Sequence, residues 1–251
     1  FYRFLIAYLG IWVISPKRLF TNNWQDELWL VAGGIFGGSL YFFTENTALG
    51  ITQASNVSFI ICTAPLLTTI LSLLFYKSEK ASKGLIYGSL LALMGVGLIV
   101  FNGSFVLKIS PIGDLLTLLA ALSWAFYSLI IKKMAGRYPT VFITRKIFFY
   151  GVLTILPAFL LHPLQPDAAV LLQPGVLFNL LFLAVLASLI CYVLWNVVLK
   201  QLGTVRASNY IYLNPLVTMI ASSLILDEKI TLVALGGAAC IVCGVYWAEK
   251  K

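Results

Sequence analysis

A carboxylic acid and a carboxamide stand side by side in an otherwise apolar stretch, residues 41–50, which reads "YFFTENTALG". On insertion scales an ionisable group at the centre of a membrane helix costs about 2.5–3.5 kcal/mol, so it normally faces water, a bound solute or a partner. Glu45 could therefore exchange a proton with the outer side of a membrane or hold an amine. The alternatives are a side chain that snorkels to the interface or pairs with a neighbouring helix.

Other polar and aromatic residues are candidates for lining the same cavity. Asn46 and Asn196 could hydrogen-bond a solute or hold helices together, since an interhelical amide bond is worth about 1 kcal/mol. Trp124 and Tyr127 are three residues apart and share a helix face, although aromatic residues in membrane helices more often face lipid. The predicted cavity residues are Glu45, Asn46, Gln53, Asn56, Trp124, Tyr127, Tyr192, Trp195, Asn196, Asn209, Tyr210 and Asn214.

Two prolines, Pro65 and Pro215, occupy matching places in two apolar segments. Each removes a backbone donor and frees a carbonyl, which permits a bend of the kind that a gating helix uses. We expect both prolines to act as hinges, with a static kink as the alternative. The stretch Gly33–Gly38 contains two overlapping GxxxG patterns, which bring helices together backbone to backbone. Close packing within the chain is favoured, and a homodimer face is the alternative.

The sequence holds no constellation of residues that is typical of catalysis, metal binding or ATP hydrolysis. Its one histidine, His162, lies in a predicted outer turn, and HExxH, GxSxG and Walker motifs are absent. The four cysteines lie in apolar runs and are expected to be small buried hydrophobes, although Cys240 and Cys243 have metal or redox spacing. The sequence therefore predicts no catalytic residue, no metal, no cofactor and no enzymatic activity.

The composition determines the surroundings of these residues. Apolar residues make up 61% of the chain and charged residues 10%, and the mean hydropathy is +0.97. Soluble domains are closer to half apolar and a quarter charged, so too few charges are present to cover a soluble surface. The net charge of +8 comes from short basic runs between apolar segments, which indicates membrane orientation rather than nucleic-acid binding. We therefore predict an all-α, polytopic helical bundle whose partner is the lipid bilayer.

About 20 apolar residues are needed for a helix to cross the hydrocarbon core of a bilayer. The connections between such segments are short and contain Gly, Pro, Asn or charged residues. The nine predicted spans are 1–15, 28–49, 52–76, 84–102, 112–131, 141–161, 176–199, 204–226 and 230–248.

The basic residues are distributed unevenly between the two sides of these spans. Of the 17 Lys and Arg residues, all but Arg3, Lys108 and Lys229 belong to one alternate set of connections, and Arg145 and Lys146 are counted with that set. The positive-inside rule then places this set and the C-terminus in the cytoplasm. We expect a multi-pass protein of the plasma or inner cell membrane.

A weak internal repeat relates the two halves of the chain. A shift of 150 residues pairs Asn46 with Asn196 and Pro65 with Pro215, and a shift of 149 pairs glycines 88 and 95 with 237 and 244. The predicted repeats are 1–103 and 111–249. The chain opens inside an apolar run, so we expect one further helix before it and five helices in each copy. An odd number of spans inverts one copy relative to the other, as in secondary transporters.

Several stretches resemble the EamA-type transporters of the drug/metabolite transporter superfamily. They are "GDLLTLLAALSWAFYSLIIKK" (113–133), Arg3-Phe4 near the start, residues 54–80 and residues 206–230. The resemblance covers the whole chain but lacks the family's first helix. It implies ten helices in two inverted five-helix copies, of which nine are present here. It also implies a central cavity lined by the first, third, fourth, sixth, eighth and ninth helices, and transport of amino acids, other metabolites or toxic compounds.

These observations together predict a secondary transporter or exporter of small organic solutes that works by alternating access, with proton coupling as an option. A flippase of a lipid-linked metabolite within the same superfamily is the alternative. A membrane enzyme would need a nucleophile–base pair or metal ligands that the sequence does not provide. A purely structural scaffold would not explain the paired polar positions.

Overall fold

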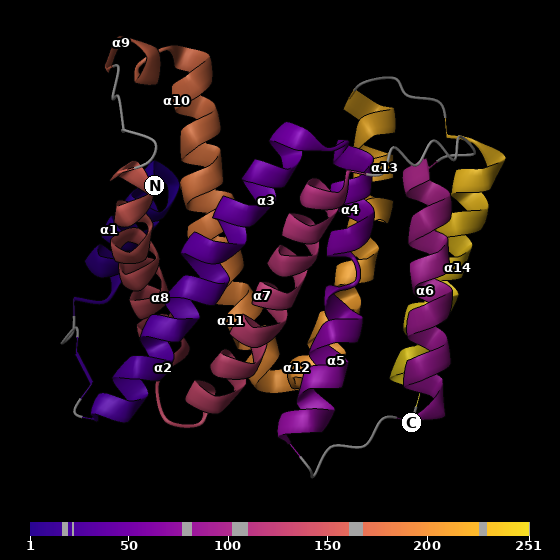
Figure 1. Cartoon of the computed structure of the whole chain (residues 1–251), viewed down its shortest axis with the longest axis horizontal. Helices are drawn as coiled ribbons and strands as arrows, with labels where there is room; N and C mark the ends of the chain where they lie inside the picture. The colour runs from indigo at the N-terminus through magenta and orange to yellow at the C-terminus, as the bar shows by residue number, and fades with distance from the viewer. Residues whose placement is uncertain are drawn as a thin grey trace. The chain divides into compact units, whose positions relative to one another are not determined.

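The computed structural model describes residues 1–16, 20–21, 23–76, 82–101, 110–160, 168–225 and 230–250. Throughout this part of the chain the regular elements are helices and none is a strand (Figure 1). The predicted all-α membrane bundle is therefore confirmed. His162, Lys108 and Lys229 lie outside the described residues, so the expectations that concern them stay predictions.

Within the residues that the structure describes, six of the predicted spans are present as helices that are long and apolar enough to cross a membrane. They are Ala54–Phe75, Lys83–Phe101, Pro111–Ala135, Thr140–Leu160, Pro174–Leu202 and Leu232–Glu249. The predicted span 1–15 is a shorter apolar helix, α1 (Tyr2–Ile14). The spans 28–49 and 204–226 are helical over most of their length, but polar residues such as Glu45 and Asn209 interrupt their apolar character.

The chain folds into two compact units, each built from two separate stretches. Unit 1 comprises Phe1–Tyr41 and Phe126–Leu202, and unit 2 comprises Phe42–Ala125 and Gly203–Lys251. Unit 1 holds α1, α2 (Trp24–Gly34), η1 (Ile35–Ser39), α8 (Thr140–Ile155), η2 (Leu156–Leu160), α9 (Ala168–Leu171), α10 (Pro174–Leu181), η3 (Phe182–Ile190) and α11 (Cys191–Leu202). Unit 2 holds α4 (Ala54–Ile61), α5 (Ala64–Phe75), α6 (Lys83–Phe101), α12 (Thr204–Asn209), η4 (Tyr210–Leu213), α13 (Asn214–Ile225) and α14 (Leu232–Glu249). The division falls within α3 (Leu40–Ile51) and α7 (Pro111–Ala135).

In unit 1, α2 begins at a capped end and packs through glycines. The side-chain oxygen of Asn23 accepts a hydrogen bond from the backbone of Gln25 at 2.9 Å. Asp26 and Glu27 occupy the first turn, where the helix dipole favours negative charge. A Cβ added to any of the four glycines of the stretch 33–38 would collide with atoms of the same unit. The GxxxG glycines therefore pack within the chain, as predicted.

In unit 2, α6 and α14 run antiparallel with their main chains in contact (Figure 1). A Cβ added to Gly95 would lie 2.5 Å from the carbonyl oxygen of Gly237, and one added to Gly244 would lie 2.6 Å from that of Gly88. Real Cβ atoms essentially never approach other atoms this closely, so only glycine fits these positions. The contact is symmetric with respect to the predicted repeat. Gly95 meets Gly237, which is the counterpart of Gly88, and Gly88 meets Gly244, which is the counterpart of Gly95.

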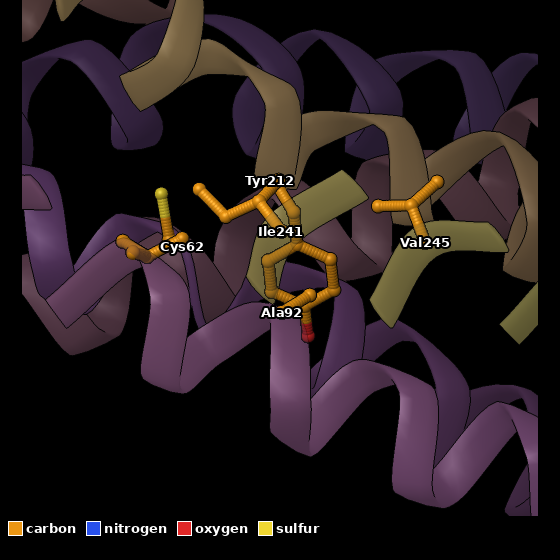
Figure 2. Packing of buried hydrophobic residues seen from close by; sticks show 6 residues of the cluster. Cys62, Ala92, Tyr212, Ile241 and Val245 are labelled. Carbon is orange, nitrogen blue, oxygen red and sulfur yellow. The ribbon is translucent and has the colours of Figure 1, made fainter. Parts of the chain in front are cut away.

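The core of unit 2 also brings together residues that are equivalent in the predicted repeat. Its buried residues are Cys62, Ala92, Val96, Tyr212, Ile241 and Val245 (Figure 2). They form three pairs under the predicted shifts, which relate residue 62 to 212, 92 to 241 and 96 to 245. Residues that are equivalent in the two halves of the sequence therefore pack together around one centre.

Both predicted hinges lie at interruptions of a helix. α4 ends at Ile61 and α5 begins at Ala64, directly before the buried Pro65. The 3₁₀ turn η4 separates α12 from α13, whose second residue is the buried Pro215. A proline cannot donate to the preceding turn and restricts the residue before it, which explains both breaks. The structure thus has an interruption beside each proline, whereas the role of the two prolines as hinges stays a prediction.

Candidate functional site

Three predicted cavity residues of unit 1 are buried close to one another, and two of them belong to one hydrogen-bonded network. The hydroxyl of Tyr127 on α7 donates to Oδ1 of Asn196 on α11 at 2.8 Å. The Nδ2 of Asn196 donates to Oγ1 of Thr144 on α8 at 2.9 Å. Tyr127 and Asn196 are 0% and 1% exposed, so both are removed from solvent and lipid. One amide therefore joins three helices, and each of its polar atoms has a partner.

The third of these residues, Tyr192, binds the backbone of η1. Its hydroxyl donates to the carbonyl oxygen of Gly37 at 2.7 Å. η1 is a π-helical segment, in which the usual i→i+4 hydrogen bonds are displaced, so a carbonyl can become available to a side chain. The ring of Tyr192 lies 6.0 Å from that of Tyr127 and 5.4 Å from that of Phe148. Aromatic walls therefore surround the hydrogen-bonded groups.

A second π-helical segment, η3, makes a comparable contact. Nη2 of Arg3 donates to the carbonyl oxygen of Ala187 at 3.4 Å, and Nε donates to the hydroxyl of Ser188. Ala187 is the counterpart of Gly37 under the shift of 150 residues. Equivalent carbonyls in the two halves of the sequence thus each accept a hydrogen bond from a side chain. Neither π-helical segment was expected from the sequence.

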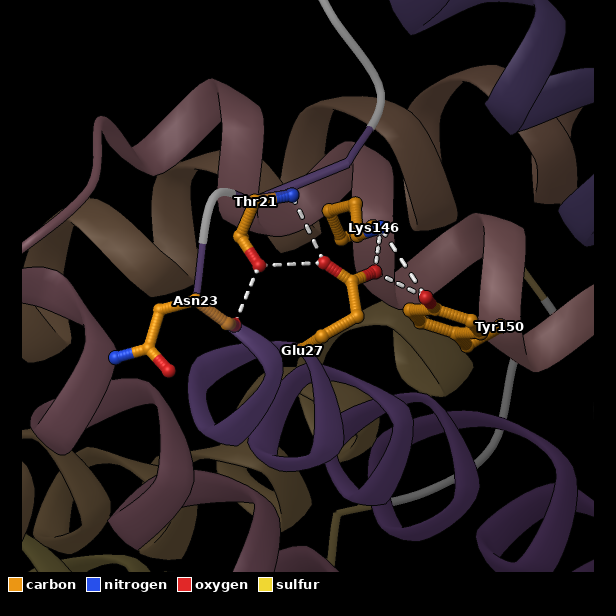
Figure 3. Close-up of polar contacts among 5 residues, drawn as sticks. All are labelled: Thr21, Asn23, Glu27, Lys146 and Tyr150. Atoms are coloured by element: carbon orange, nitrogen blue, oxygen red, sulfur yellow. Dashed lines mark hydrogen bonds and ion pairs between the residues drawn. The ribbon is translucent and has the colours of Figure 1, made fainter.

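A buried ion pair links α2 to α8 (Figure 3). Lys146 and Tyr150 both donate to Oε1 of Glu27. The hydroxyl and backbone nitrogen of Thr21 donate to its Oε2 at 2.7 and 2.9 Å. Glu27 precedes the predicted span 28–49. Burial alone would raise the pKa of Glu27, but the hydrogen bonds from Lys146, Tyr150 and Thr21 outweigh it and hold that pKa at about 2.

The placement of Arg145 and Lys146 corrects the sequence analysis, which counted both among the connections. They lie inside α8 and are 1% and 0% exposed. A buried cation needs a compensating partner, and the structure supplies one for each: Nη1 of Arg145 donates to the carbonyl of Ser15 at 2.5 Å, and Lys146 pairs with Glu27. Two adjacent cations inside a predicted span were the signal that could have indicated this cluster.

A further ionic contact lies just before α8. Nη1 of Arg137 is 2.5 Å from Oδ1 of Asp26, and the hydroxyl of Tyr138 donates to Oδ2 of the same carboxylate at 2.9 Å. Burial and this hydrogen bond to Asp26 raise the pKa of the Tyr138 hydroxyl. Asp26 and Glu27 are adjacent on α2 and thus bind neighbouring parts of the segment 137–150.

The other predicted cavity residues take different positions. Asn56 and Asn209 are buried, and Oδ1 of Asn209 accepts from the hydroxyl of Ser89 at 3.5 Å. Glu45, Trp124 and Trp195 are half-buried, whereas Asn46, Gln53, Tyr210 and Asn214 are exposed. Asn46 and its counterpart Asn196 therefore have unlike surroundings, although the repeat places them at equivalent points.

Comparisons with known proteins agree with these features. The profile of the EamA-like transporter family matches residues 1–101 and 111–248. An uncharacterized transporter of Archaeoglobus fulgidus is 29% identical over 255 residues, which cover 100% of this chain and 86% of that protein. A probable amino-acid metabolite efflux pump of Escherichia coli is 24% identical over 248 residues, which cover 96% of this chain and 81% of that protein.

A solved crystal structure superposes with a TM-score of 0.80 over 99% of this chain and 85% of its own. The sequence identity is 18%, so this likeness concerns the fold alone. The family match extends over nearly all of the chain, which contains six helices able to cross a membrane among its described residues. The chain therefore belongs to the EamA-like transporter family and is a multi-pass membrane transporter.

Proposed function

We propose that this chain exports small organic solutes, such as amino acids or their metabolites, across the cell membrane by alternating access. The observation that carries the proposal is the buried network of Tyr127, Asn196 and Thr144, beside which the ring of Tyr192 packs. Buried polar groups in membrane helices are costly and commonly mark solute pathways. The name of the Escherichia coli relative, a probable amino-acid metabolite efflux pump, supports the same class of solute.

Inverted repeats would supply the alternation, because exchanging the conformations of two inverted copies exposes a shared site to the opposite side. The reciprocal packing in unit 2 supports this part of the proposal. Gly88 and Gly95 on α6 meet Gly244 and Gly237 on the antiparallel α14. A two-fold axis perpendicular to the helices would pair the glycines in this crossed way. The three related pairs in the core fit the same axis.

A carboxyl group is the natural carrier of a proton in such a cycle. Glu45 on α3 is half-buried, and we propose it as the coupling residue that binds a proton or a solute amine. The distribution of Lys and Arg supports a cytoplasmic C-terminus. A proton taken up from outside would then drive export.

Transport by the full-length protein in proteoliposomes, under an imposed pH gradient, tests this proposal. Radiolabelled amino acids should move at a rate that depends on the gradient, and Glu45→Gln should abolish that dependence. Glu249→Gln on α14 is a matched control, which should retain it. If Glu45→Gln transports at the same rate as the parent protein and neither rate depends on pH, Glu45 has no part in the mechanism. Movement of lipid-linked metabolites alone would favour the flippase alternative.

A further inference from the structure

The beginning of α2 and the end of α7 lie at the same end of unit 1, where two basic side chains join them (Figure 1). The ammonium nitrogen of Lys133, in the last turn of α7, is 3.7 Å from the centre of the Trp29 ring on α2. Nη1 of Arg137, just beyond α7, is 2.5 Å from Oδ1 of Asp26 in the first turn of α2. The Lys133 ammonium is therefore held at a defined place by an aromatic ring.

The contact with Trp29 leaves the positive charge of Lys133 without an anion. A lysine ammonium carries three N–H donors, and an aromatic face attracts the charge without replacing a carboxylate. Within the described part of the chain, Lys133 has no carboxylate partner. Its side chain is half-buried, so a group from outside the protein can reach it.

The two acids in the first turn of α2 are already bound by other residues. Asp26 and Glu27 are 4% and 7% exposed, so neither contributes much to the surface. Asp26 contacts Arg137, and Glu27 pairs with Lys146. Their charges are thus compensated where they lie, and neither acid is available to Lys133. The accessible surface at this end of α2 and α7 therefore attracts an anion.

An exposed apolar strip adjoins this cation. Trp24 and Leu28 are four residues apart on α2 and so share a face of the helix, and Trp29 follows Leu28 directly. The three side chains are 75%, 51% and 40% exposed. Tryptophan in membrane proteins prefers the level of the lipid headgroups, because its ring is apolar and its N–H can meet water. The strip therefore offers contact to an acyl chain beside a place for an anionic headgroup.

We infer that Lys133, Trp29, Trp24 and Leu28 bind one anionic phospholipid, and we call these four residues the α2–α7 lipid site. The lipid phosphate accepts charge-assisted hydrogen bonds from the Lys133 ammonium, and an acyl chain lies along Leu28 and Trp24. A zwitterionic lipid brings a second cation that Lys133 repels, whereas a free phosphate makes no use of the apolar strip. The predicted orientation places this site at the cytoplasmic face, where the membrane surface is anionic.

Native mass spectrometry of the full-length protein in detergent tests the site without any assumption about transport. The probes are dioleoylphosphatidylglycerol, which is anionic, and dioleoylphosphatidylcholine, which is zwitterionic and has the same acyl chains. For the first lipid bound, we expect the parent protein to prefer the anionic probe at least about tenfold in Kd. Lys133→Gln should reduce this preference to about twofold or less, because one cation near the phosphate is lost. A parent protein without such a preference would overturn the inference.

Lys200→Gln is the matched control. Lys200 also lies in the last turn of a helix of unit 1, α11, and is exposed, but within the described residues it contacts no aromatic ring. This variant removes the same charge on the same predicted side of the membrane, and it should keep the full preference for the anionic probe. Equal losses in Lys133→Gln and Lys200→Gln would show only a general attraction of basic residues to anionic lipid, and would contradict a specific site.

Two further measurements examine the ring and the acyl chain. Trp29→Leu keeps an apolar side chain but removes the ring that holds the ammonium, so the preference should fall at least about threefold. An unchanged preference in this variant would show that the ring takes no part, against the inference. Glycerol 3-phosphate has the headgroup phosphate without acyl chains, and at about tenfold molar excess it should leave the lipid bound. Displacement of the lipid would assign the site to free phosphate and overturn the inference.

Discussion

At the scale of single residues, the side chain of Asn196 connects helices of unit 1. Its two polar atoms bind Tyr127 and Thr144 on different helices, and it is 1% exposed. An amide whose partners are all protein groups positions the helices around it. A solute that reaches this network would therefore meet groups that are already oriented by one another.

Asn196→Leu should lower the free energy of unfolding by about 1–3 kcal/mol, because the hydroxyl of Tyr127 would lose its buried acceptor. Asn46→Leu is the control at the equivalent position, and its exposed side chain should change stability by no more than about 0.5 kcal/mol. Chemical unfolding in detergent measures both. Equal losses in the two variants would show that the network is not the source of the effect.

Glu27 gives the chain a specific sensitivity to acid. Its pKa of about 2 lies below the ordinary value of 4.5, so its contribution to stability is complete above pH 4.5 and is lost as the pH falls toward 2. We expect the unfolding temperature of the parent protein to fall over this window.

Glu27→Gln should flatten that acid dependence, and it should destabilise the protein at pH 7 by about 3–5 kcal/mol because Lys146 would be left as an unpaired buried cation. Thermal unfolding followed from pH 7 to pH 3 measures both effects. If the unfolding temperature of Glu27→Gln falls with pH as steeply as that of the parent protein, other groups cause the acid sensitivity.

At the scale of elements, main-chain contact decides how α6 and α14 pair. Gly237→Ala should separate the two helices and lower the unfolding temperature, because its Cβ would lie 2.7 Å from the carbonyl oxygen of Gly95. Gly236→Ala, one residue earlier on α14, meets nothing within 4 Å and should stabilise the helix by about 0.5–1 kcal/mol. We expect Gly237→Ala to lower the stability and Gly236→Ala to raise it. Stability changes of the same sign in the two variants would contradict the packing.

The helix breaks and the glycine contacts could be predicted because their causes are local. A proline cannot continue the hydrogen bonds of a helix, and a glycine permits close approach whatever surrounds it. The π-helical segments η1 and η3 were not predicted, and the side-chain donors that bind their carbonyls come from distant parts of the sequence. Those donors are Tyr192 for Gly37 and Arg3 for Ala187.

The buried charges illustrate the same limit. The count of basic residues between the spans grouped Arg145 and Lys146 with the cations that orient the chain. Their burial depends on Glu27 and on the carbonyl of Ser15. Similarly, Tyr127, Tyr192 and Asn196 could be recognised as polar or aromatic residues in apolar spans. Their meeting at one place depends on the packing of helices that are far apart in the sequence.

At the scale of the whole molecule, the inversion of the two repeats has a direct topological test. Ser82 follows the span that ends at Phe75, and Ile230 follows the span that contains α13, the corresponding part of the second repeat. If the copies are inverted, Ile230→Cys should react with a membrane-impermeant thiol reagent on intact cells and Ser82→Cys should not. Both positions are exposed, so burial cannot mask the difference. Labelling of both from the same side would exclude inversion.

The glycines at positions 88, 95, 237 and 244 also limit how this gene can drift. Every single-base missense change in a glycine codon introduces a residue with a Cβ, so only synonymous changes are neutral at these four sites. Lipid-facing leucines on the same helices can exchange with isoleucine, valine or methionine at little cost. Inherited variation along α6 and α14 should therefore accumulate on their outer surfaces and spare these four codons.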